Sequence, residues 1–323
     1  MIANARILVT GAAGFLGSHL CEKLVEYEVD RLVMVDDFSL GTRANICKLL
    51  DLENVSLKKA DASDYDQMSD IYSEENIDVT FNLAVIPLPA SLITPKKTVD
   101  KNIQITSTLC ELQYRGKYET LIHISSSEIY GTALTKNGSI DEKHPTLPIT
   151  PYAASKLASD HIALSYYLTF GSDLMILRPF NMYGPRQNAE TYAAVIPITI
   201  RRIMAGKPPI IQGDGLQTRD FSYVEDVAEA IPLFYGIPET KGIVVNLASG
   251  EEIAIKSLIT SIMDLMDYNE DPVYTDARKG DVRRHKANIS LAKKLIGYRP
   301  KTDFSKGLLK TIEWYKRADG MIK

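Results

Sequence analysis

A glycine-rich turn near the start of the chain constrains the fold more than any other feature. The run VTGAAGFLG places Gly11, Gly14 and Gly17 at the spacing G-x-x-G-x-x-G. An apolar strand pattern (6–11) precedes it, and a helical pattern (16–27) follows it. Gly11 allows a tight turn, Gly14 lets the backbone approach a pyrophosphate, and Gly17 lets helix and strand pack closely. The spacing predicts a dinucleotide-binding strand–turn–helix unit.

The alternation of strand and helix continues through the first 125 residues. Short apolar runs predict further strands at 31–36, 55–61, 79–84 and 120–125. Helical patterns lie between them at 65–76 and 100–116. This order predicts an α/β fold with a doubly wound parallel (Rossmann) sheet, because parallel neighbours need a helical crossover between strands.

The pattern becomes less regular after residue 170. The run DLMILRPFN (173–181) continues the sheet, whereas helices are predicted at 193–206 and 304–317 with Pro- and Gly-rich loops between them. We therefore predict a Rossmann domain over 1–178, with later segments returning to it. A smaller C-terminal α/β lobe over 179–323 is expected to bind the substrate.

Composition excludes several classes of protein. A net charge of -4 over 323 residues does not suggest a nucleic-acid or anionic-membrane partner. The start lacks the pattern of a signal peptide, and the chain has no run of about 18 uncharged apolar residues that would span a membrane. The scattered Cys21, Cys47 and Cys110 are typical of reduced thiols, not of a disulfide frame or a metal cluster. We expect a cytoplasmic protein without a metal site.

Two aspartates follow strands of the predicted nucleotide-binding half. Asp36 ends the second strand, 19 residues after Gly17, where an acid holds the adenosine ribose 2′-hydroxyl. An acid there repels a 2′-phosphate, so the sequence favours NAD over NADP. Arg43 is a counter-signal that we interpret as a solvated loop residue. Asp61 follows the third strand, where it either reaches the adenine or serves as a plain turn aspartate.

A tyrosine and a lysine share one face of a predicted helix. Thr150 is a candidate N-cap, Pro151 takes the first helical position, and Tyr152 and Lys156 follow four residues apart. A nearby ammonium and a positive nicotinamide ring favour the phenolate, so the pKa of the tyrosine is expected to fall. Tyr152 then accepts a hydroxyl proton while hydride leaves the same carbon. The alternative is an ordinary surface pair. Upstream, the serines at 125–127 end the strand expected to reach the nicotinamide.

Seven motifs follow one another along almost the whole chain: TGAAGFLG (10–17), FNLA (81–84), SSSEIYG (125–131), PYAASK (151–156), RPFNMYGPR (178–186), GDGLQTRDFSYVEDV (213–227) and GYRPKTDFSKGLLKTIEWY (297–315). In this order they resemble the extended short-chain dehydrogenase/reductase family of NAD-dependent nucleotide-sugar epimerases and dehydratases. The resemblance implies a bound NAD, a nucleotide-sugar substrate and a homodimer formed through a four-helix bundle.

The resemblance also implies roles around the cofactor. Ser126 assists Tyr152, and Lys156 holds the nicotinamide ribose. The implied cofactor-binding residues are Gly11, Gly14, Phe15, Leu16, Gly17, Asp36, Asp61, Ala62, Leu83, Ala84, Tyr152 and Lys156.

On the substrate side, Asn181 is expected to contact the diphosphate or the sugar. Arg219, together with one of Arg283 and Arg284, is expected to face the diphosphate, since a guanidinium fork suits bidentate phosphate contact. The implied substrate-binding residues are Ser127, Asn181, Val195, Gln212, Arg219 and Arg283.

Three positions depart from the pattern of the family. The family usually has His where this chain has Asn82, and Asp where it has Asn288. The segment VIPLPA (85–90) is unusually apolar and proline-rich for one that lines a sugar pocket. The departures at 82 and 85–90 bear on the identity of the sugar and not on the cofactor.

Glu128, in SSSEIYG, indicates which reaction the enzyme performs. Members that only epimerise C4 usually carry small or hydroxyl residues at positions 127 and 128, whereas 4,6-dehydratases carry a carboxylate at 128. After C4 is oxidised, the C5 proton is acidic, so a carboxylate can remove it while water leaves from C6. The dTDP-glucose dehydratases add an Asp at the position of Ser127, which this chain lacks. The alternative is that Glu128 caps a turn.

The Ser-Ser-Glu run is similar to the Thr-Ser-Glu of three groups: GDP-mannose 4,6-dehydratases, UDP-N-acetylglucosamine 4,6-dehydratases of legionaminate synthesis, and UDP-glucuronate decarboxylases. The motifs around it look most like the legionaminate type. We therefore predict a UDP-hexose 4,6-dehydratase with Tyr152, Lys156, Ser126 and Glu128 as its catalytic residues. The alternatives are a C4 epimerase, a UDP-glucuronate decarboxylase and a non-catalytic NAD-sensing protein.

Overall fold

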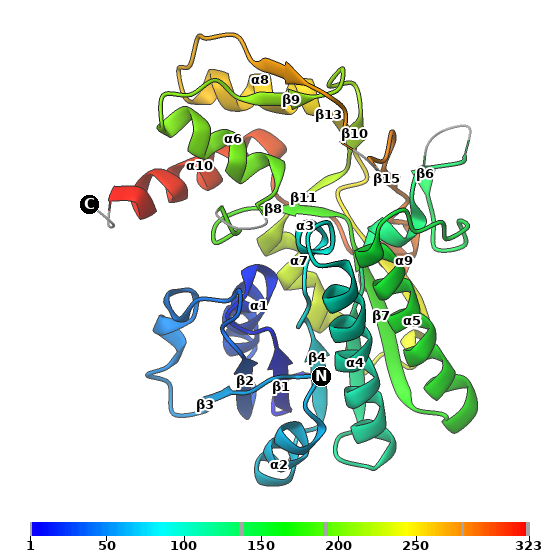
Figure 1. Cartoon of the computed structure of the whole chain (residues 1–323). Helices are drawn as coiled ribbons and strands as arrows, with labels where there is room; N and C mark the ends of the chain where they lie inside the picture. Colours follow the sequence, from blue (N-terminus) through cyan, green and yellow to red (C-terminus); the bar gives the residue numbers. More distant parts are fainter. Residues whose placement is uncertain (1, 136–138, 190–192, 279–280, 321–323) are drawn as a thin grey trace.

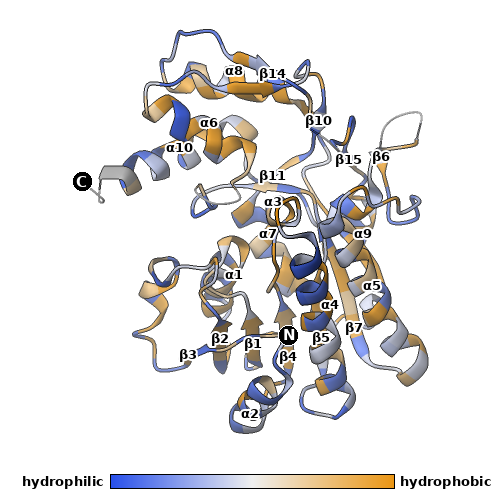
Figure 2. Ribbon diagram, viewed as in Figure 1, coloured by the Kyte–Doolittle hydropathy of each residue, from blue (hydrophilic) through white to orange (hydrophobic). Residues whose placement is uncertain are grey.

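A seven-stranded parallel sheet forms the centre of the computed structural model, which describes residues 2–135, 139–189, 193–278 and 281–320 (Figure 1). Its strand order is β12-β7-β5-β4-β1-β2-β3. The strands are β1 (Arg6–Thr10), β2 (Arg31–Asp36), β3 (Val55–Lys59), β4 (Val79–Asn82), β5 (Thr120–Ile124), β7 (Asp173–Pro179) and β12 (Val244–Leu247). This arrangement confirms the predicted doubly wound Rossmann fold, and Figure 2 shows the apolar strands at its centre.

Helices cover both faces of the sheet. Ile7 and Val9 of β1 pack into one apolar cluster with α1 (Phe15–Glu26) and α7 (Val224–Ala230). Leu8, between them, points to a second cluster on the other face. The helices of that second face are α2 (Tyr65–Glu75), α4 (Pro95–Tyr114) and α5 (Pro151–Phe170). The near-continuous apolar runs of the strands follow from this double coverage.

Several elements begin or end at other residues than the sequence predicts. Strand β3 ends two residues early, at Lys59, opposite Asp36, the last residue of β2. Strand β4 ends two residues early, at Asn82, opposite Thr10, the last residue of β1. Helix α4 begins five residues early, at Pro95. A proline fits the first turn of a helix, since its missing N–H has no intrahelical partner there.

The C-terminal part of the chain has an apolar cluster of its own. Helices α6 (Val195–Met204), α8 (Ile255–Leu265) and α10 (Phe304–Gly320) pack together there with β9 (Ile210–Gln212). However, β12 pairs with β7 in the central sheet, and α7 packs against α1. Later segments thus return to the first part, while the boundary at 178/179 stays a prediction.

The remaining elements are short and connect these parts. They are α3 (Leu88–Ser91), α9 (Ser290–Ile296), β6 (Ser139–Ile140), β8 (Asn181–Tyr183), β10 (Thr218–Arg219), β11 (Phe221–Tyr223), β13 (Ile253–Ala254), β14 (Val273–Thr275) and β15 (Lys286–Ala287), with the 3₁₀ turns η1 (Arg43–Asn45), η2 (Cys47–Leu49), η3 (Ser127–Tyr130), η4 (Ile231–Phe234) and η5 (Pro238–Thr240). Strand β8 pairs with β11, and β15 pairs with β6.

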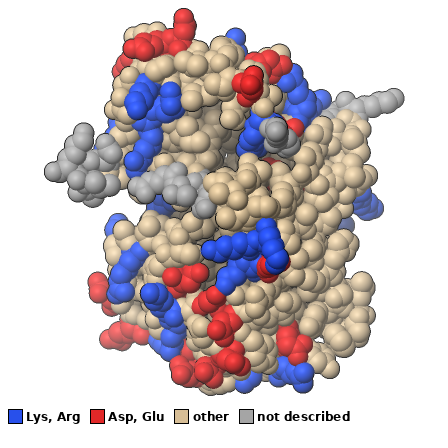
Figure 3. Space-filling model, viewed as in Figure 1, with Lys and Arg blue, Asp and Glu red and all other residues tan. Residues whose placement is uncertain are grey.

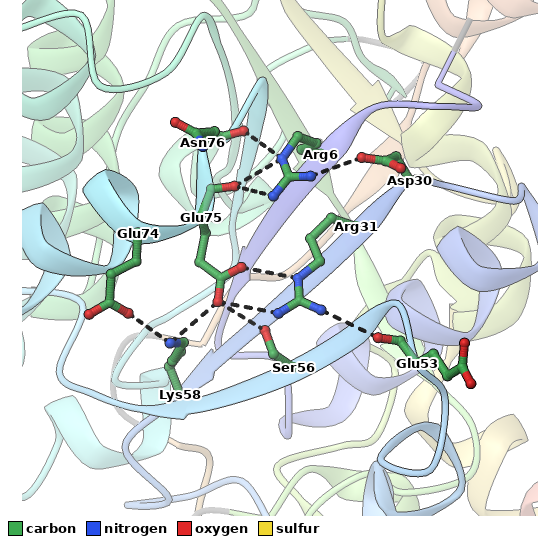
Figure 4. Close-up of polar contacts among 9 residues, drawn as sticks. All are labelled: Arg6, Asp30, Arg31, Glu53, Ser56, Lys58, Glu74, Glu75 and Asn76. Atoms are coloured by element: carbon green, nitrogen blue, oxygen red, sulfur yellow. Dashed lines mark hydrogen bonds and ion pairs between the residues drawn. The ribbon is translucent and has the colours of Figure 1, made fainter.

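A group of ion pairs fixes the edge of the sheet at the amino ends of β1 and β2 (Figure 4). Arg6 donates to the carbonyls of Glu75 and Asn76 at the C-terminal end of α2. The helix dipole also favours a cation at that end. Arg31 and Lys58 pair with the Glu75 carboxylate at 3.0 and 3.3 Å. These contacts join α2 to the strands at the edge opposite the one that carries the predicted site.

Candidate active site

The predicted site residues gather where the parallel strands end. Gly11 follows β1, Asp36 ends β2, and Leu83 follows β4. Ser126 follows β5, and Asn181 comes two residues after β7. In open α/β sheets, ligands bind in the crevice outside the carboxyl ends of the strands. The fold therefore brings together, at one edge, side chains that are up to 170 residues apart in the sequence.

The glycine-rich turn has the geometry of a phosphate cradle. Gly11 has φ +66°, and a Cβ there would lie 2.9 Å from the Ala84 nitrogen. A Cβ on Gly17 would lie 2.1 Å from the Gly11 oxygen, so only glycine lets α1 approach β1 so closely. At Gly14, at the start of α1, the corresponding contact is with the Gly11 oxygen alone, at 3.1 Å. These residues fit the pyrophosphate of a dinucleotide.

The other predicted cofactor residues surround this turn. Phe15 and Leu16 begin α1, and Ala62 is buried after β3. The backbone N–H groups of Leu83 and Ala84 both donate to the Thr10 hydroxyl, at 3.2 Å. The end of β4 is thereby held against the end of β1, next to the cradle.

Asp36 is buried and holds the turn itself, a contact that the sequence did not reveal. One carboxylate oxygen accepts from the Ala13 N–H at 2.9 Å, and the other accepts from the Phe38 N–H at 2.8 Å. Burial raises the pKa of Asp36, and these two hydrogen bonds lower it. Each carboxylate oxygen can accept more than one bond, so Asp36 remains able to accept from a ribose hydroxyl.

Asp61 forms the contacts of a turn aspartate. Its carboxylate accepts from the Ser63 N–H and hydroxyl, at 3.0 and 2.9 Å, and it pairs with Lys101 of α4. Burial acts to raise the pKa of Asp61, but Lys101 and Ser63 lower it overall. Asp61 therefore serves as a turn aspartate in this structure, and its contact with adenine stays a prediction.

Tyr152 and Lys156 lie in the first turns of α5, as predicted. The Thr150 hydroxyl accepts from the Ala153 N–H at 3.2 Å, which confirms Thr150 as the N-cap, and Pro151 is the first helical residue. The Lys156 ammonium donates to the Ile124 carbonyl at 2.7 Å. Helix α5 thus places the lysine under the end of β5.

The surroundings of Tyr152 act on its pKa in opposite directions. Burial raises it to about 12, against a lowering hydrogen bond with Ser126. Glu128 and Asp160 raise it further, because their negative charges oppose a phenolate. Burial also lowers the pKa of Lys156 to about 8, although the Asp160 charge raises it. The lowering predicted from a protonated Lys156 together with a bound nicotinamide therefore stays a prediction.

Glu128 lies in η3, between the tyrosine and a group of arginines. The Ser126 hydroxyl caps η3 by accepting from the Glu128 N–H at 3.2 Å. Burial raises the pKa of Glu128, whereas Arg219 and Arg278 lower it. The Glu128 carboxylate is thus within electrostatic reach of both the Tyr152 hydroxyl and the predicted diphosphate site.

Arg219 is buried in β10 and firmly held. Its guanidinium donates to the carbonyls of Thr218 and Val282, at 2.8 and 2.5 Å, and to Asp281 at 2.5 Å. Arg278 pairs with the same Asp281 oxygen at 3.2 Å. Two guanidinium groups therefore share one carboxylate next to Glu128, and both belong to the side of the site predicted to hold phosphate.

Arg283 and Arg284, the two candidates for the second arginine, have other partners in this structure, and their role stays a prediction. Arg283 is exposed and pairs with Asp214 at 2.8 Å. Arg284 donates to both oxygens of Glu252. The family resemblance indicated Arg283 and Arg284, and the sequence analysis overlooked Arg278, whose proximity to Arg219 arises only in the fold.

The other predicted substrate residues occupy different surroundings. Asn181, at the start of β8, lies 3.5 Å from Nδ1 of the buried His285, whose Nε2 faces the Ser127 carbonyl at 3.1 Å. Burial lowers the pKa of His285 to about 3, so the ring is neutral. It donates from Nε2 to the Ser127 carbonyl in η3 and accepts at Nδ1 from the Asn181 amide in β8. Val195 begins α6, and Gln212 ends β9 with an exposed side chain.

The surface charges are mixed, and the described residues contain no candidate metal site. Figure 3 shows acidic and basic side chains interspersed over one face, with a hollow between the C-terminal lobe and the sheet. In the described residues, no group of three or more His, Cys, Asp or Glu side chains is arranged to hold a metal ion. None of the helices in these ranges is long and apolar enough to cross a membrane.

Comparison with known proteins identifies a common family. The sequence pattern of the NAD dependent epimerase/dehydratase family matches residues 7–248. The chain is similar to a putative UDP-glucose 4-epimerase of Methanocaldococcus jannaschii, with 31% identity over 311 residues that cover 96% of this chain and 98% of that protein. It is also similar to a dTDP-glucose 4,6-dehydratase of an Actinoplanes species, with 30% identity and coverages of 96% and 98%.

Solved structures share the whole fold. The crystal structure of DesIV, a dTDP-glucose 4,6-dehydratase from Streptomyces venezuelae with NAD bound, aligns with a TM-score of 0.91. Sequence identity is 27%, and the alignment covers 98% of each chain. The family match and the geometry of the glycine-rich turn agree with each other. The chain therefore belongs to the NAD-dependent epimerase/dehydratase family of enzymes, and its cofactor is NAD.

Proposed function

We propose that this enzyme is a 4,6-dehydratase of a UDP-linked hexose. The observation that carries the proposal is the place of Glu128, a partly buried carboxylate whose charge acts both on Tyr152 and on the arginines of the substrate side. A C5 proton must be removed during dehydration but not during C4 epimerisation. A carboxylate with a raised pKa, close to the tyrosine, suits that step.

The side chains have distinct tasks in this reaction. NAD, when bound, takes hydride from C4 of the sugar and later returns it to C6. Tyr152 accepts the proton of the C4 hydroxyl, and Ser126 shares the hydrogen bond to the same oxygen. Because burial holds the pKa of Tyr152 at about 12, the positive charge of Lys156 is needed to stabilise the phenolate.

The 4-keto sugar then loses water. Oxidation at C4 makes the C5 hydrogen acidic, and Glu128 removes it while the C6 hydroxyl leaves as water. Dehydration needs an acid for that leaving hydroxyl: in this proposal the protonated Glu128 gives it the proton taken from C5, and C5 receives a proton from solvent when hydride is added to C6. The same carboxyl can therefore serve as base and then as acid.

The diphosphate of the substrate is assigned to Arg219 and Arg278. The two guanidinium groups share Asp281, so one or both can exchange that partner for phosphate oxygens. Asn181 lies at the edge of this group and is assigned to the diphosphate or sugar. Arg283 and Arg284 are paired with Asp214 and Glu252, and each could exchange that partner in the same way, so either stays an alternative to Arg278.

A C4 epimerase is the second candidate. The M. jannaschii relative is named as an epimerase, and Glu128 lies beside Arg219 and Arg278, where it could serve only to balance their charge. A UDP-glucuronate decarboxylase is the third. The predicted alternative of an NAD-sensing protein without activity is not retained, because the chain belongs to a family of enzymes.

Mass spectrometry of products from a panel of nucleotide sugars separates these reactions. We expect the product of a UDP-hexose to be about 18 mass units lighter than the substrate, because the elimination step expels one water molecule. Loss of carbon dioxide from UDP-glucuronate would identify a decarboxylase. An unchanged mass with an altered sugar configuration would identify an epimerase. The same panel with dTDP- and GDP-linked hexoses tests the choice of nucleotide base. UDP-N-acetylglucosamine tests the legionaminate-type substrate.

Cofactor preference follows from Asp36. We expect NAD to bind about tenfold or more tightly than NADP, because a 2′-phosphate would meet a buried carboxylate that the ribose hydroxyl can instead contact. Isothermal titration with both nucleotides measures the ratio. Asp36→Asn is expected to reduce the ratio, whereas Arg43→Ala, at an exposed position in η1, is expected to leave it unchanged. Equal affinities in the wild type would contradict this role of Asp36.

The homodimer remains a proposal as well. Helices α4 and α5 pack side by side and carry the exposed apolar residues Tyr114, Leu168 and Phe170. A second copy of these helices would cover such a surface, and sedimentation velocity would show a dimer or a monomer. A cytoplasmic location likewise stays a prediction.

A further inference from the structure

A cluster of charged side chains is buried below Tyr152 and Lys156. Asp160 lies one helical turn after Lys156 on α5, at the same spacing that separates Lys156 from Tyr152. Asp160, Lys156 and Arg178 are 1%, 4% and 5% exposed. Charged groups of this kind are costly to bury unless they compensate one another.

Arg178 of β7 fixes one oxygen of Asp160. Its Nε and Nη2 atoms donate to Oδ2 at 3.0 and 2.9 Å. Its Nη1 atom donates to the Tyr130 hydroxyl at 2.8 Å, and that hydroxyl donates to Asn246 at 2.8 Å. Burial raises the pKa of Asp160, while Arg178, the Ser125 hydroxyl and Lys156 lower it. A guanidinium is always protonated, and its two donated bonds favour the ionised form of Asp160.

A chain of directed hydrogen bonds leads toward the other oxygen of Asp160. The N–H groups of residues 83–84 donate to the Thr10 hydroxyl, so its own proton points to Asn82 Oδ1 at 2.9 Å. The Asn82 amide nitrogen then donates to His123 Nδ1 at 3.0 Å. Burial lowers the pKa of His123 well below its usual range, so the neutral ring carries its proton on Nε2. That N–H faces Asp160 Oδ1 at 3.7 Å, which is beyond hydrogen-bond distance, so the hydrogen-bonded chain ends at His123.

The cluster therefore contains one anion and two cations. Lys156 makes its direct hydrogen bond to the Ile124 carbonyl, which carries only a partial charge. Asp160 is the carboxylate whose charge favours the ammonium over the neutral amine, whereas burial favours the amine. Without Asp160, both Arg178 and Lys156 would be buried cations.

We propose that Asp160 is a positioning residue for the reaction: its carboxylate, fixed by Arg178, keeps Lys156 protonated and so maintains the positive charge beside Tyr152. The proposal rests on the roles assigned above to Tyr152 and Lys156. The titratable groups around the lysine and its partners are Tyr152 and Asp160 of α5, His123 of β5, Glu128 and Tyr130 of η3, and Arg178 of β7.

The pH profile of kcat/KM tests this role. Lys156 with a pKa of about 8 predicts that activity declines as the pH rises through that value, because the lysine then loses its charge. In Asp160→Asn the decline is expected about one pH unit or more lower, since an opposite charge close by shifts a pKa by that amount. Asp160→Glu, which retains the carboxylate, is expected to restore most of the wild-type profile.

A measurement without substrate separates this proposal from the proposed function. Lysine labelled with ¹³C at Cε reports the protonation of Lys156 by NMR, and the signal is assigned by its loss in Lys156→Met. We expect a lower titration midpoint in Asp160→Asn than in the wild type, with NAD bound in both. An unchanged midpoint overturns the role of Asp160. A shifted midpoint in an enzyme that converts no nucleotide sugar supports that role and overturns the proposed function instead.

Asp160→Asn also leaves Arg178 buried without an anion, which can unfold the protein. The double variant Asp160→Asn/Arg178→Met removes both charges together, a change that buried pairs often tolerate. Circular dichroism and thermal unfolding verify its fold. A lower Lys156 midpoint is expected here as well, since Asp160 and not Arg178 has the larger effect on the lysine. A wild-type midpoint in the folded double variant overturns the proposal.

Discussion

Tyr152→Phe is expected to bind NAD and the nucleotide sugar almost as the wild type does, but to oxidise C4 about 10²–10⁴ times more slowly. The phenyl ring keeps the packing of α5, whereas the group that accepts the C4 hydroxyl proton is lost. The change therefore removes an interaction made in the transition state and lowers kcat more than it raises KM. Single-turnover formation of reduced cofactor, followed by absorbance, measures the oxidation step directly.

Tyr166→Phe is the matched control for this experiment. Tyr166 lies on the same helix and loses an equivalent hydroxyl, but its partner is Glu111 of α4. We expect it to retain wild-type kinetics. A Tyr152→Phe enzyme that reduced its cofactor as fast as the wild type would show that another group accepts the proton.

Glu128→Gln is expected to oxidise C4 and then stop. The amide preserves the shape of the side chain but cannot accept the C5 proton, so the cofactor stays reduced and elimination slows by about 10²–10⁴. Turnover in D₂O, with deuterium located by NMR, follows the step. The wild-type product is expected to carry deuterium at C5 and to lack the C6 hydroxyl, whereas exchange at C5 should nearly disappear in the variant.

The pH dependence gives the same residue a second test. Burial raises the pKa of Glu128, so the base is lost as the pH falls through a value above that of an ordinary glutamate. That acidic limb should be absent from the residual rate of Glu128→Gln. Glu111→Gln, at a surface ion pair with Arg115, controls for the loss of a carboxylate elsewhere. A C4 epimer without deuterium at C5, formed equally well by the variant, would identify an epimerase in which Glu128 has only a structural role.

Much of the fold follows from local patterns in the sequence. Strand and helix periodicity repeat within a few residues, and the glycine spacing depends on backbone conformations that neighbouring residues impose. The parallel sheet, the turn at Gly11 and the N-cap Thr150 were therefore predictable. Boundaries such as the start of α4 at Pro95 were not, because the end of an element depends on its neighbours in space.

The positions of Tyr152 and Lys156 were also local information, since four residues separate them on one helix. Their electrostatic environment was not. The sequence suggested that the ammonium lowers the pKa of the tyrosine, but burial raises that pKa to about 12. Burial is a property of the assembled core, and no spacing of residues along the chain indicates how completely a hydroxyl is removed from water.

The arginine that shares Asp281 with Arg219 could also not be predicted from local sequence. The family resemblance indicated Arg283 and Arg284, which pair with Asp214 and Glu252 in the fold. Arg278 reaches the site instead, through Asp281. The sequence by itself determined the Rossmann sheet, the nucleotide-binding turn and the Tyr–Lys helix, because each depends on residues within a few turns of one another. Only the tertiary structure decided which charges meet at Glu128 and Lys156, because those partners come from strands and loops far apart in the chain and their protonation depends on shared burial.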